Sequence, residues 1–307
     1  MYWQYGSSKA YTACKTPLSV PPVNPIDILS LFIASLNSGS NGNCYYVGNE
    51  ADAVLIDAGL SCRETEKRMA RLGLSLDKVR AVFISHEHSD HIRGLEVLAR
   101  KYGLPVYITP ATLANSRLVL AQDLVYTFLP HVGITIGSLT VLPFPKFHDA
   151  SDPHSFVVSG NAVHIGVFTD IGFCCEDVVR YFAQCHAVFL EANYDEEMLE
   201  QGRYPWHLKN RIRGGRGHLS NGQSLELFRK HKPAYMTHIL LAHLSKDNNS
   251  PEMVRELFAS HAGTTFVEVA SRYQETDVFE ITADTAATMP VRPKKIQLEV
   301  IQLTLFD

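Results

Sequence analysis

The sequence predicts an α/β fold in which layered sheets carry helices on their outer faces. Short apolar runs alternate with stretches of helical periodicity through most of the chain, and no internal repeat appears. Many of the apolar runs end in a histidine, an aspartate or a glutamate. Because strand ends converge in such a fold, we expect a polar site along one edge of the sheets.

The apolar runs give the expected strands in chain order, and amphipathic spacing gives the helices. We expect strands at residues 29–36, 44–47, 53–57, 81–85, 105–108, 140–144, 155–158, 163–169, 188–190 and 236–241, the last being the final core strand. We expect helices at 64–72, 92–102 and 110–120, and another that begins near residue 220.

Three segments of the chain differ in character. Residues 1–27 contain Pro17, Pro21, Pro22 and Pro25 without periodicity, which predicts a disordered arm. Residues 28–282 form the expected globular domain, and 283–307 read as a linker and a tail. No run approaches the ~18 apolar residues that span a membrane. We therefore expect a cytoplasmic protein without membrane contact.

The composition narrows the possible partners and cofactors. The chain has 307 residues, 46% of them hydrophobic, and a net charge of −4. There is no global basic field, so any nucleic-acid contact must come from a local patch. None of the six cysteines forms a C-x-x-C pair, which argues against a zinc ribbon. We interpret them as mostly buried thiols in a reducing compartment.

A cluster of ligand-type residues follows the apolar run 81–85. His86, His88, Asp90 and His91 fall within six positions, between an expected strand and an expected helix. Alternate residues of extended chain point the same way, and the helix start can face a second point nearby. This arrangement suits two metal ions that take imidazole and carboxylate ligands. The alternative is a polar loop that contains histidines by chance.

The spacing H-x-H-x-D-H resembles the signature of the metallo-β-lactamase superfamily. The resemblance implies an αβ/βα sandwich, with two mixed sheets packed face to face and helices outside. It also implies two divalent metal ions, zinc or manganese. Further ligands should follow later strands, at His148, Asp170 and His243, and His154 is the alternative to His148.

The resemblance divides the ligands into two sets around a bridging carboxylate. The expected ligands are His86, His88 and His148 for one ion and Asp90, His91 and His243 for the other, with Asp170 bridging the two.

Further stretches resemble one branch, the YycJ/WalJ-type proteins, which are related to ribonucleases Z and J and regarded as 5′-to-3′ exonucleases. The matching stretches are S-G-S-N-G-N-C at 38–44, L-I-D-A-G at 55–59, H-D-A at 148–150, F-T-D-I-G at 168–172, E-A-N-Y-D at 191–195, G-H-L-S-N at 217–221 and H-L-S-K-D-N-N at 243–249. They run in family order from about residue 30 to 282; the arm, the tail and His154 depart from the pattern. The resemblance implies catalytic roles for Asp90, Asp170, Glu191 and His218, in which Glu191 orients His218 or a water, or is only a paired acid.

Four stretches offer contacts for a phosphate chain. The loop 37–43 has backbone N–H groups and small amides that could contact a phosphate. The equally favoured alternative is that this loop is only a tight hairpin. Residues 203–216 hold five Lys or Arg, no Asp or Glu, and interleaved aromatics, and the alternative is a solvated helix face. The candidate contacts are Ser40, Asn41, Asn43, Arg211, Arg213, Arg216, Ser220 and Asn221 at a helix start, and Lys246 and Asn248 after the last ligand.

These features predict a dinuclear-metal phosphodiesterase, a 5′-to-3′ exonuclease acting on DNA in replication or repair. RNA is the alternative polymer. A small-molecule ester or thioester hydrolase of the glyoxalase II kind is the alternative enzyme. A repair adaptor with a vestigial site is disfavoured, because a candidate residue occupies every expected ligand position.

The last residues of the chain predict a partner. Gln302, Leu303, Leu305 and Phe306 resemble the Q-L-x-L-F peptide with which bacterial polymerases and repair proteins bind the DNA sliding clamp. A glutamine for polar contacts and apolar side chains for pockets suit a tethered anchor. The alternative is an edge strand, but the apolar alternation of the tail changes parity after Val300.

Overall fold

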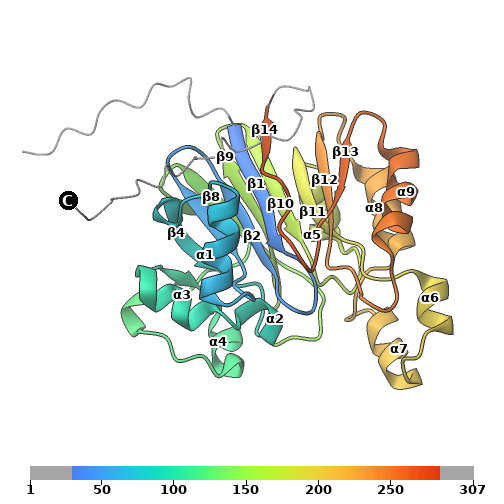
Figure 1. The fold of residues 1–307 in the computed structure, drawn as a ribbon, viewed down its shortest axis with the longest axis horizontal. Helices are drawn as coiled ribbons and strands as arrows, with labels where there is room; N and C mark the ends of the chain where they lie inside the picture. Colours follow the sequence, from blue (N-terminus) through green and yellow to red (C-terminus); the bar gives the residue numbers. More distant parts are fainter. Residues whose placement is uncertain (1–29, 284–307) are drawn as a thin grey trace, which may run out of the picture.

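The computed structural model describes residues 30–283, which form two seven-stranded sheets packed face to face. Figure 1 shows the sheets in the middle, with α1 and α3 on one side and α8 and α9 on the other. The predicted αβ/βα sandwich is confirmed. The expected arm at 1–27 and the tail from 284 to 307 lie outside the described residues.

The first sheet has the strand order β14-β1-β2-β3-β4-β5-β6. Its neighbours are antiparallel from β14 to β3 and parallel from β3 to β6. The strands are β1 (Ser30–Asn37), β2 (Cys44–Gly48), β3 (Ala53–Ile56), β4 (Val79–Phe83), β5 (Val106–Tyr107), β6 (Val125–Tyr126) and β14 (Phe279–Thr282).

The second sheet has the order β13-β12-β11-β10-β9-β8-β7, parallel from β10 to β13 and antiparallel elsewhere. Its strands are β7 (Ile134–Ile136), β8 (Leu139–Pro145), β9 (His154–Gly160), β10 (Val163–Phe168), β11 (Ala187–Glu191), β12 (His238–Ala242) and β13 (Phe266–Val269).

Five of the helices in the described residues begin at a side-chain cap. Ser61, Thr109, Asp195, Ser220 and Ser250 each accept a hydrogen bond from the first turn of the helix that follows. The helices are α1 (Cys62–Arg71), α2 (Ser89–Ile92), α3 (Leu95–Tyr102), α4 (Pro110–Ser116), α5 (Glu176–Phe182), α6 (Glu196–Gln201), α7 (Trp206–Arg213), α8 (Asn221–His231) and α9 (Pro251–Ala262), with 3₁₀ turns at Leu76–Lys78 and Gln122–Leu124.

Apolar side chains fill three layers of the sandwich. Alternate residues of β1 show the division: Leu31 and Ile33 join the layer between the sheets, whereas Ala34 and Leu36 face the helices beside the first sheet. A third layer lies between the second sheet and its helices, where Phe228 of α8 and Phe258 of α9 are buried. Both sheets are thus covered on both faces, and polar residues gather where the strands end.

The parallel strands of both sheets deliver polar residues to one edge. Asp57 follows β3, Asp170 follows β10 and His243 follows β12, and all three have left-handed backbone conformations, with φ of 62°, 55° and 57°. For a non-glycine residue this conformation costs roughly 1–3 kcal/mol, and such strain tends to occur at functional sites.

Two expectations about the elements are wrong. The strand expected at 236–241 is not the last, because β13 and β14 follow it; each has four residues and includes an acid, Glu268 or Glu280, so its apolar signal is weak. The helix expected at 92–102 is interrupted at Gly94, whose N–H donates to the Ala58 carbonyl at 2.8 Å. Within the described residues, no helix has the length and apolar character that crossing a bilayer would require.

The interruption at Gly94 gives a test of how tightly the metal-turn region is packed. A Cβ on Gly94 would lie 1.6 Å from the Leu60 carbonyl oxygen. Gly94→Ala is therefore expected to lower the free energy of unfolding by about 1–3 kcal/mol, measured by urea denaturation. At Gly215 the nearest atom to a Cβ is 3.9 Å away, so Gly215→Ala is the matched control. Equal stability of the two variants would contradict this packing.

Candidate metal centre

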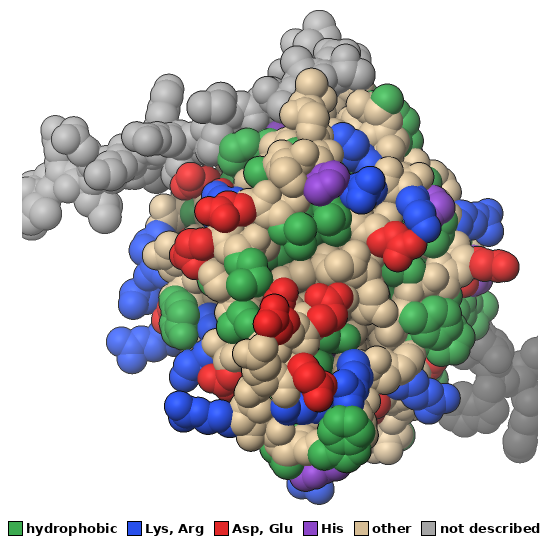
Figure 2. All heavy atoms as spheres, turned by 90° about the vertical axis from the view of Figure 1, so that its right-hand side faces the viewer, with side chains coloured by type: hydrophobic (Ala, Val, Ile, Leu, Met, Phe, Trp, Pro, Cys, Tyr) green, Lys and Arg blue, Asp and Glu red, His purple; other side chains and the backbone are tan. Residues whose placement is uncertain are grey.

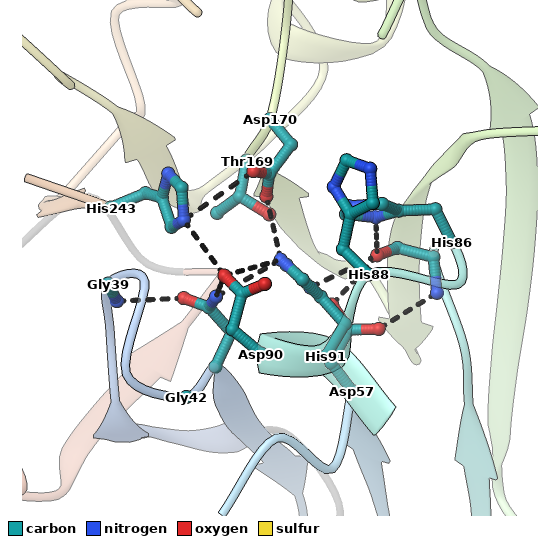
Figure 3. Close-up of polar contacts among 12 residues, drawn as sticks. Gly39, Gly42, Asp57, His86, His88, Asp90, His91, Thr169, Asp170 and His243 are labelled. Carbon is teal, nitrogen blue, oxygen red and sulfur yellow. Dashed lines mark hydrogen bonds and ion pairs between the residues drawn. The ribbon is translucent and has the colours of Figure 1, made fainter. Parts of the chain in front are cut away.

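The residues predicted as ligands meet at the shared edge of the two sheets. Figure 3 labels each of them except His148. His86 and His88 follow β4, Asp90 and His91 lie in α2, and His148 follows β8. Together with Asp170 and His243, they form overlapping groups in which one ligand atom per residue lies within 4.8 Å of the others. The folded chain thus brings all seven predicted ligands together from both halves of the sequence.

His86, His88 and His148 form the first group. The distance from Nε2 of His86 to Nδ1 of His88 is 3.0 Å, and Nε2 of His148 lies 3.4 Å from the same atom. Three nitrogens that converge at this distance suit one metal ion with imidazole ligands.

Asp90, His91 and His243 form the second group. Oδ2 of Asp90 lies 3.5 Å from Nε2 of His91 and 3.6 Å from Nε2 of His243. Asp170 lies between the groups: its Oδ2 is 3.3 Å from Nε2 of His91, and its Oδ1 is 3.5 Å from Nε2 of His243 and 3.9 Å from Nε2 of His148. This position suits the bridging role expected of Asp170.

Buried acceptors orient the imidazole rings. Nδ1 of His91 lies 2.7 Å from Oδ2 of Asp57, and Nδ1 of His148 lies 3.0 Å from the Gly217 carbonyl oxygen. A proton shared with these acceptors sits on Nδ1 and leaves Nε2 toward the cluster. Asp57 also accepts from the backbone N–H and the hydroxyl of Ser85, at 2.8 and 2.9 Å, which holds its carboxylate in place.

Glu191 supports the opposite side of the centre. Its Oε1 lies 2.8 Å from Nδ1 of His218 and 3.2 Å from Nδ1 of His243, and its Oε2 accepts from the N–H groups of Ile171 and Leu219. Glu191 is fully buried, and these contacts hold its pKa at about 2: burial raises the pKa, but His218 and His243 lower it more. The carboxylate therefore positions two histidines.

The two groups differ in electrostatic character. Burial, with further contributions from neighbouring imidazoles and Lys146, holds the pKa of His86 well below its ordinary value, and burial lowers that of His148 to about 4. Burial also opposes the charge of His243, but the nearby carboxylates of Asp170, Asp90 and Glu191 raise its pKa to about 10. The first ligand group thus presents neutral imidazoles, and the second lies among carboxylates. Divalent ions such as zinc and manganese bind this combination of ligands.

Unsatisfied atoms in the cluster fit bound metal. Oδ2 of Asp170 and Nε2 of His243 are buried without a hydrogen-bond partner. A buried polar atom without a partner costs about 1–3 kcal/mol, and a metal ion would satisfy both atoms. The residues present therefore fit a divalent metal.

His154 takes no part in the centre. It begins β9, its Nδ1 lies 3.0 Å from the Asp152 carbonyl oxygen, and its ring packs edge-on against Phe128 at 5.1 Å between centroids. It belongs to none of the ligand groups found among the described residues. Of the two histidines considered in this part of the chain, His148 is the one that meets the cluster.

The expected phosphate contacts divide into buried and exposed residues. Asn43 is buried, and its amide reaches Asp90 and His91 at 3.1 Å. Ser220 is buried in the capping box of α8, and Asn221 and Asn248 are also buried. The hydrogen bonds of these four side chains lie within the loops around the centre, and their contact with substrate stays a prediction. The exposed candidates are Ser40, Asn41, Arg211, Arg213, Arg216 and Lys246.

Partners already occupy part of the basic segment. Arg211 pairs with Asp149, and Arg213 pairs with Glu200 at 2.8 Å while its guanidinium lies 4.6 Å from the Trp206 ring centre. No ion pair of Arg216 exists among the described residues, and Arg216 lies directly before Gly217, the acceptor of His148.

Sequence reasoning missed an exposed aromatic pair beside the ligands. Phe147 precedes His148, Phe173 lies three residues after Asp170, and their side chains are 45% and 40% exposed. The ring centroids are 4.4 Å apart. Each phenylalanine lies within three residues of a predicted ligand in the sequence. This short spacing was the signal that could have indicated the pair.

The chain is similar to several known proteins. The beta-lactamase superfamily domain matches residues 52–239. Exodeoxyribonuclease YycJ of Bacillus anthracis is 37% identical over 230 residues, which cover 74% of this chain and 87% of that protein. The chain belongs to the YycJ/WalJ family of this superfamily. Exodeoxyribonuclease WalJ of Streptococcus pneumoniae is 31% identical over 259 residues, covering 83% of this chain and 95% of the relative.

Solved structures agree with the fold of the YycJ/WalJ family member described above. The metallo-β-lactamase fold protein YhfI from Bacillus subtilis matches with a TM-score of 0.64 and 16% identity, covering 82% of this chain and 99% of YhfI. The short form of human tRNase Z matches with a TM-score of 0.55 and 16% identity, covering 80% and 98% of the two chains. Family membership and the ligand groups confirm the prediction of a metal-dependent hydrolase that uses divalent metal.

The bond from His91 to Asp57 predicts that a residue outside the ligand set controls metal binding. Asparagine has nearly the size of aspartate and also tolerates a positive φ. Asp57→Asn therefore removes only the charge that orients His91. We expect the affinity for zinc or manganese to fall about 10–100-fold, measured by titration of the metal-free protein. Asp52→Asn is the control, since Asp52 pairs with Arg80 and Ser138 away from the ligands. Unchanged affinity in Asp57→Asn would show that the bond is dispensable.

Proposed function

We propose that this protein is a dinuclear-metal phosphodiesterase that degrades DNA from a 5′ end. The observation that carries the proposal is the set of two ligand groups joined by Asp170, in a chain whose relatives are named exodeoxyribonucleases. Each group would hold one divalent ion, zinc or manganese. Two ions a short distance apart suit the displacement of a leaving oxygen from phosphate.

Divalent ions held by these two ligand groups would lower the pKa of a water molecule from 15.7 to about 7 and would neutralise charge on the phosphate. The protein then has to position the substrate and handle the leaving oxygen. His218 suits the second task, because Glu191 fixes its Nδ1 and its ring lies 5.2 Å from the rings of both His148 and His243. In this proposal, Nε2 of His218 donates a proton to the leaving oxygen, and Glu191 orients the ring.

The surroundings of the centre favour a polymer over a small ester. Among residues 30–283, Arg216 has no carboxylate that pairs with it, and the exposed rings of Phe147 and Phe173 offer stacking surfaces for bases. On the face that carries α8 and α9, Lys and Arg are interspersed with Asp and Glu and form no continuous basic field (Figure 2). Substrate contact would therefore be local, next to the ligands.

The proposal can be tested with end-labelled DNA and RNA, single-stranded and duplex, in manganese or zinc. Label at the 5′ end should appear first as mononucleotide, whereas shortening of 5′-labelled strands would reverse the polarity. Asp170→Ala should reduce turnover to the level of the metal-free protein, because it removes the ligand shared by both groups. His261→Ala, an exposed position on α9, is the control. Turnover of a thioester without release of nucleotides would favour the glyoxalase II-like alternative.

Arg216 should contribute to polymer binding more than its paired neighbours. We expect Arg216→Ala to raise the KM for single-stranded DNA about 3- to 10-fold and to reduce the salt dependence of binding by about one phosphate contact. Arg229→Ala provides the control, since this exposed arginine lies in the last turn of α8. Equal effects of the two substitutions would mean that Arg216 makes no specific contact with the DNA.

We further propose that the tail recruits the enzyme to the DNA sliding clamp. Gln302, Leu303, Leu305 and Phe306 lie outside the described residues, so this proposal rests on the sequence alone. Tethering would raise the local concentration of the enzyme on DNA, which suits a chain with a net charge of −4.

The tail proposal predicts that purified clamp binds the full chain but not a form ending at Lys295. Replacing Leu305 and Phe306 by alanine in the full chain should have the same effect, because both apolar anchors are lost. Calorimetry measures each affinity, and turnover of free DNA by the three proteins should be equal. Equal binding by all three, or by none, would leave the tail without this role.

A further inference from the structure

A cavity of about 420 Å³ lies beside the second ligand group, outside the metal cluster. It is walled by the chain that follows His243, by α9, and by the segment after β13. Its walls include Ser38, Leu244, Lys246, Arg255, Glu268 and Arg272.

Arg272 lines the cavity and has no counterion in the part of the chain that the structure describes. Arg272 is half-buried, and its Nη1 is buried without a hydrogen-bond partner. Among residues 30–283, no carboxylate lies within ion-pair distance of this side chain. A buried donor without a partner costs about 1–3 kcal/mol, and more if the group is charged. The site therefore favours an anionic ligand.

The other charges in the cavity do not neutralise Arg272. Glu268 is taken by Arg255, at 2.8 Å. Lys246 is exposed and has no ion pair within the described part of the chain. The walls thus carry an excess of positive charge in a chain whose net charge is negative.

The cavity shares its wall with the metal centre. Leu244 directly follows the ligand His243, and the hydroxyl of Ser38 accepts from the N–H of His243 at 2.7 Å. The side chain of Arg272 starts against the same loop, since a Cβ on Gly39 would lie 3.3 Å from the Arg272 Cβ. An anion in the cavity would therefore lie beside the residues that hold the second ligand group.

We propose that this cavity binds a phosphate group of the nucleic-acid strand while a neighbouring phosphate lies at the metal centre. The proposal rests on the function proposed above. Arg272 would bind the phosphate through its planar fork of N–H donors, and Lys246 would add charge at the mouth. The volume exceeds the needs of a phosphate alone and leaves room for an attached sugar. The phosphate can be the terminal one or an internal linkage, and both present the same anionic oxygens.

The test compares the binding of short oligothymidylates with and without a 5′-phosphate, whose linkages are phosphorothioates that slow cleavage. The proteins are the metal-loaded full chain, Arg272→Ala, Arg272→Lys and Arg100→Ala. Arg100 is an exposed arginine in the last turn of α3 and serves as the charge-matched control. Thermal melting of each protein shows whether the fold is intact.

We expect Arg272→Ala to weaken binding about 10-fold or more, Arg272→Lys to weaken it less, and Arg100→Ala to bind like the wild type. If Arg272→Ala loses the preference for a 5′-phosphate, the cavity binds the terminal phosphate. If Arg272→Ala loses the same affinity for both oligonucleotides, the cavity binds an internal phosphate. Bis(p-nitrophenyl) phosphate is too short to reach both the metal centre and the cavity. Its turnover should therefore fall less in Arg272→Ala than the turnover of the polymer.

Two results would overturn the proposal. One is unchanged oligonucleotide affinity in Arg272→Ala; the other is an equal loss on the polymer and on the chromogenic diester, which would indicate damage to the metal centre. Failure of the nuclease function is separable: it would appear as absent polymer turnover by the wild type. The affinity difference between wild type and Arg272→Ala would then still decide the cavity.

Discussion

The metal centre depends on the hydrogen bonds between buried carboxylates and the imidazoles that surround the cluster. The 2.7 Å contact between Asp57 and His91, and the contacts of Glu191 with His218 and His243, fix which nitrogen of each ring faces inward. Without these acceptors, each ring could rotate or change tautomer, and the cluster would lose its geometry. Both carboxylates are fully buried, and this is tolerable only because each accepts several hydrogen bonds.

The sandwich explains how residues distant in sequence reach this arrangement. The parallel strands of both sheets end at the same edge, and the chain turns there through left-handed residues at Asp57, Asp170 and His243. The apolar layer between the sheets sets their separation, so the two halves of the ligand set face each other across a fixed gap. Close backbone contacts such as that between Gly94 and Ala58 fasten the metal turn to the neighbouring loop.

Much of this centre could be predicted from the sequence, for a physical reason. Ligands that follow a buried strand within six residues leave a local pattern, and the resemblance of that pattern to a known superfamily supplied His148, Asp170 and His243. The support around the ligands leaves no such pattern. That Glu191 holds two histidines, or that Arg272 lacks a counterion among residues 30–283, depends on which segments meet in space. The break at Gly94 likewise arises from a tertiary contact, and β13 and β14 are too short to stand out from their surroundings.

Anomalous diffraction from crystals of the metal-loaded protein would show whether the two ligand groups joined by Asp170 hold two divalent ions. We expect two anomalous peaks, one against His86, His88 and His148 and the other against Asp90, His91 and His243, with Asp170 beside both. A single peak, or a peak that recruits His154 in place of His148, would contradict this expectation.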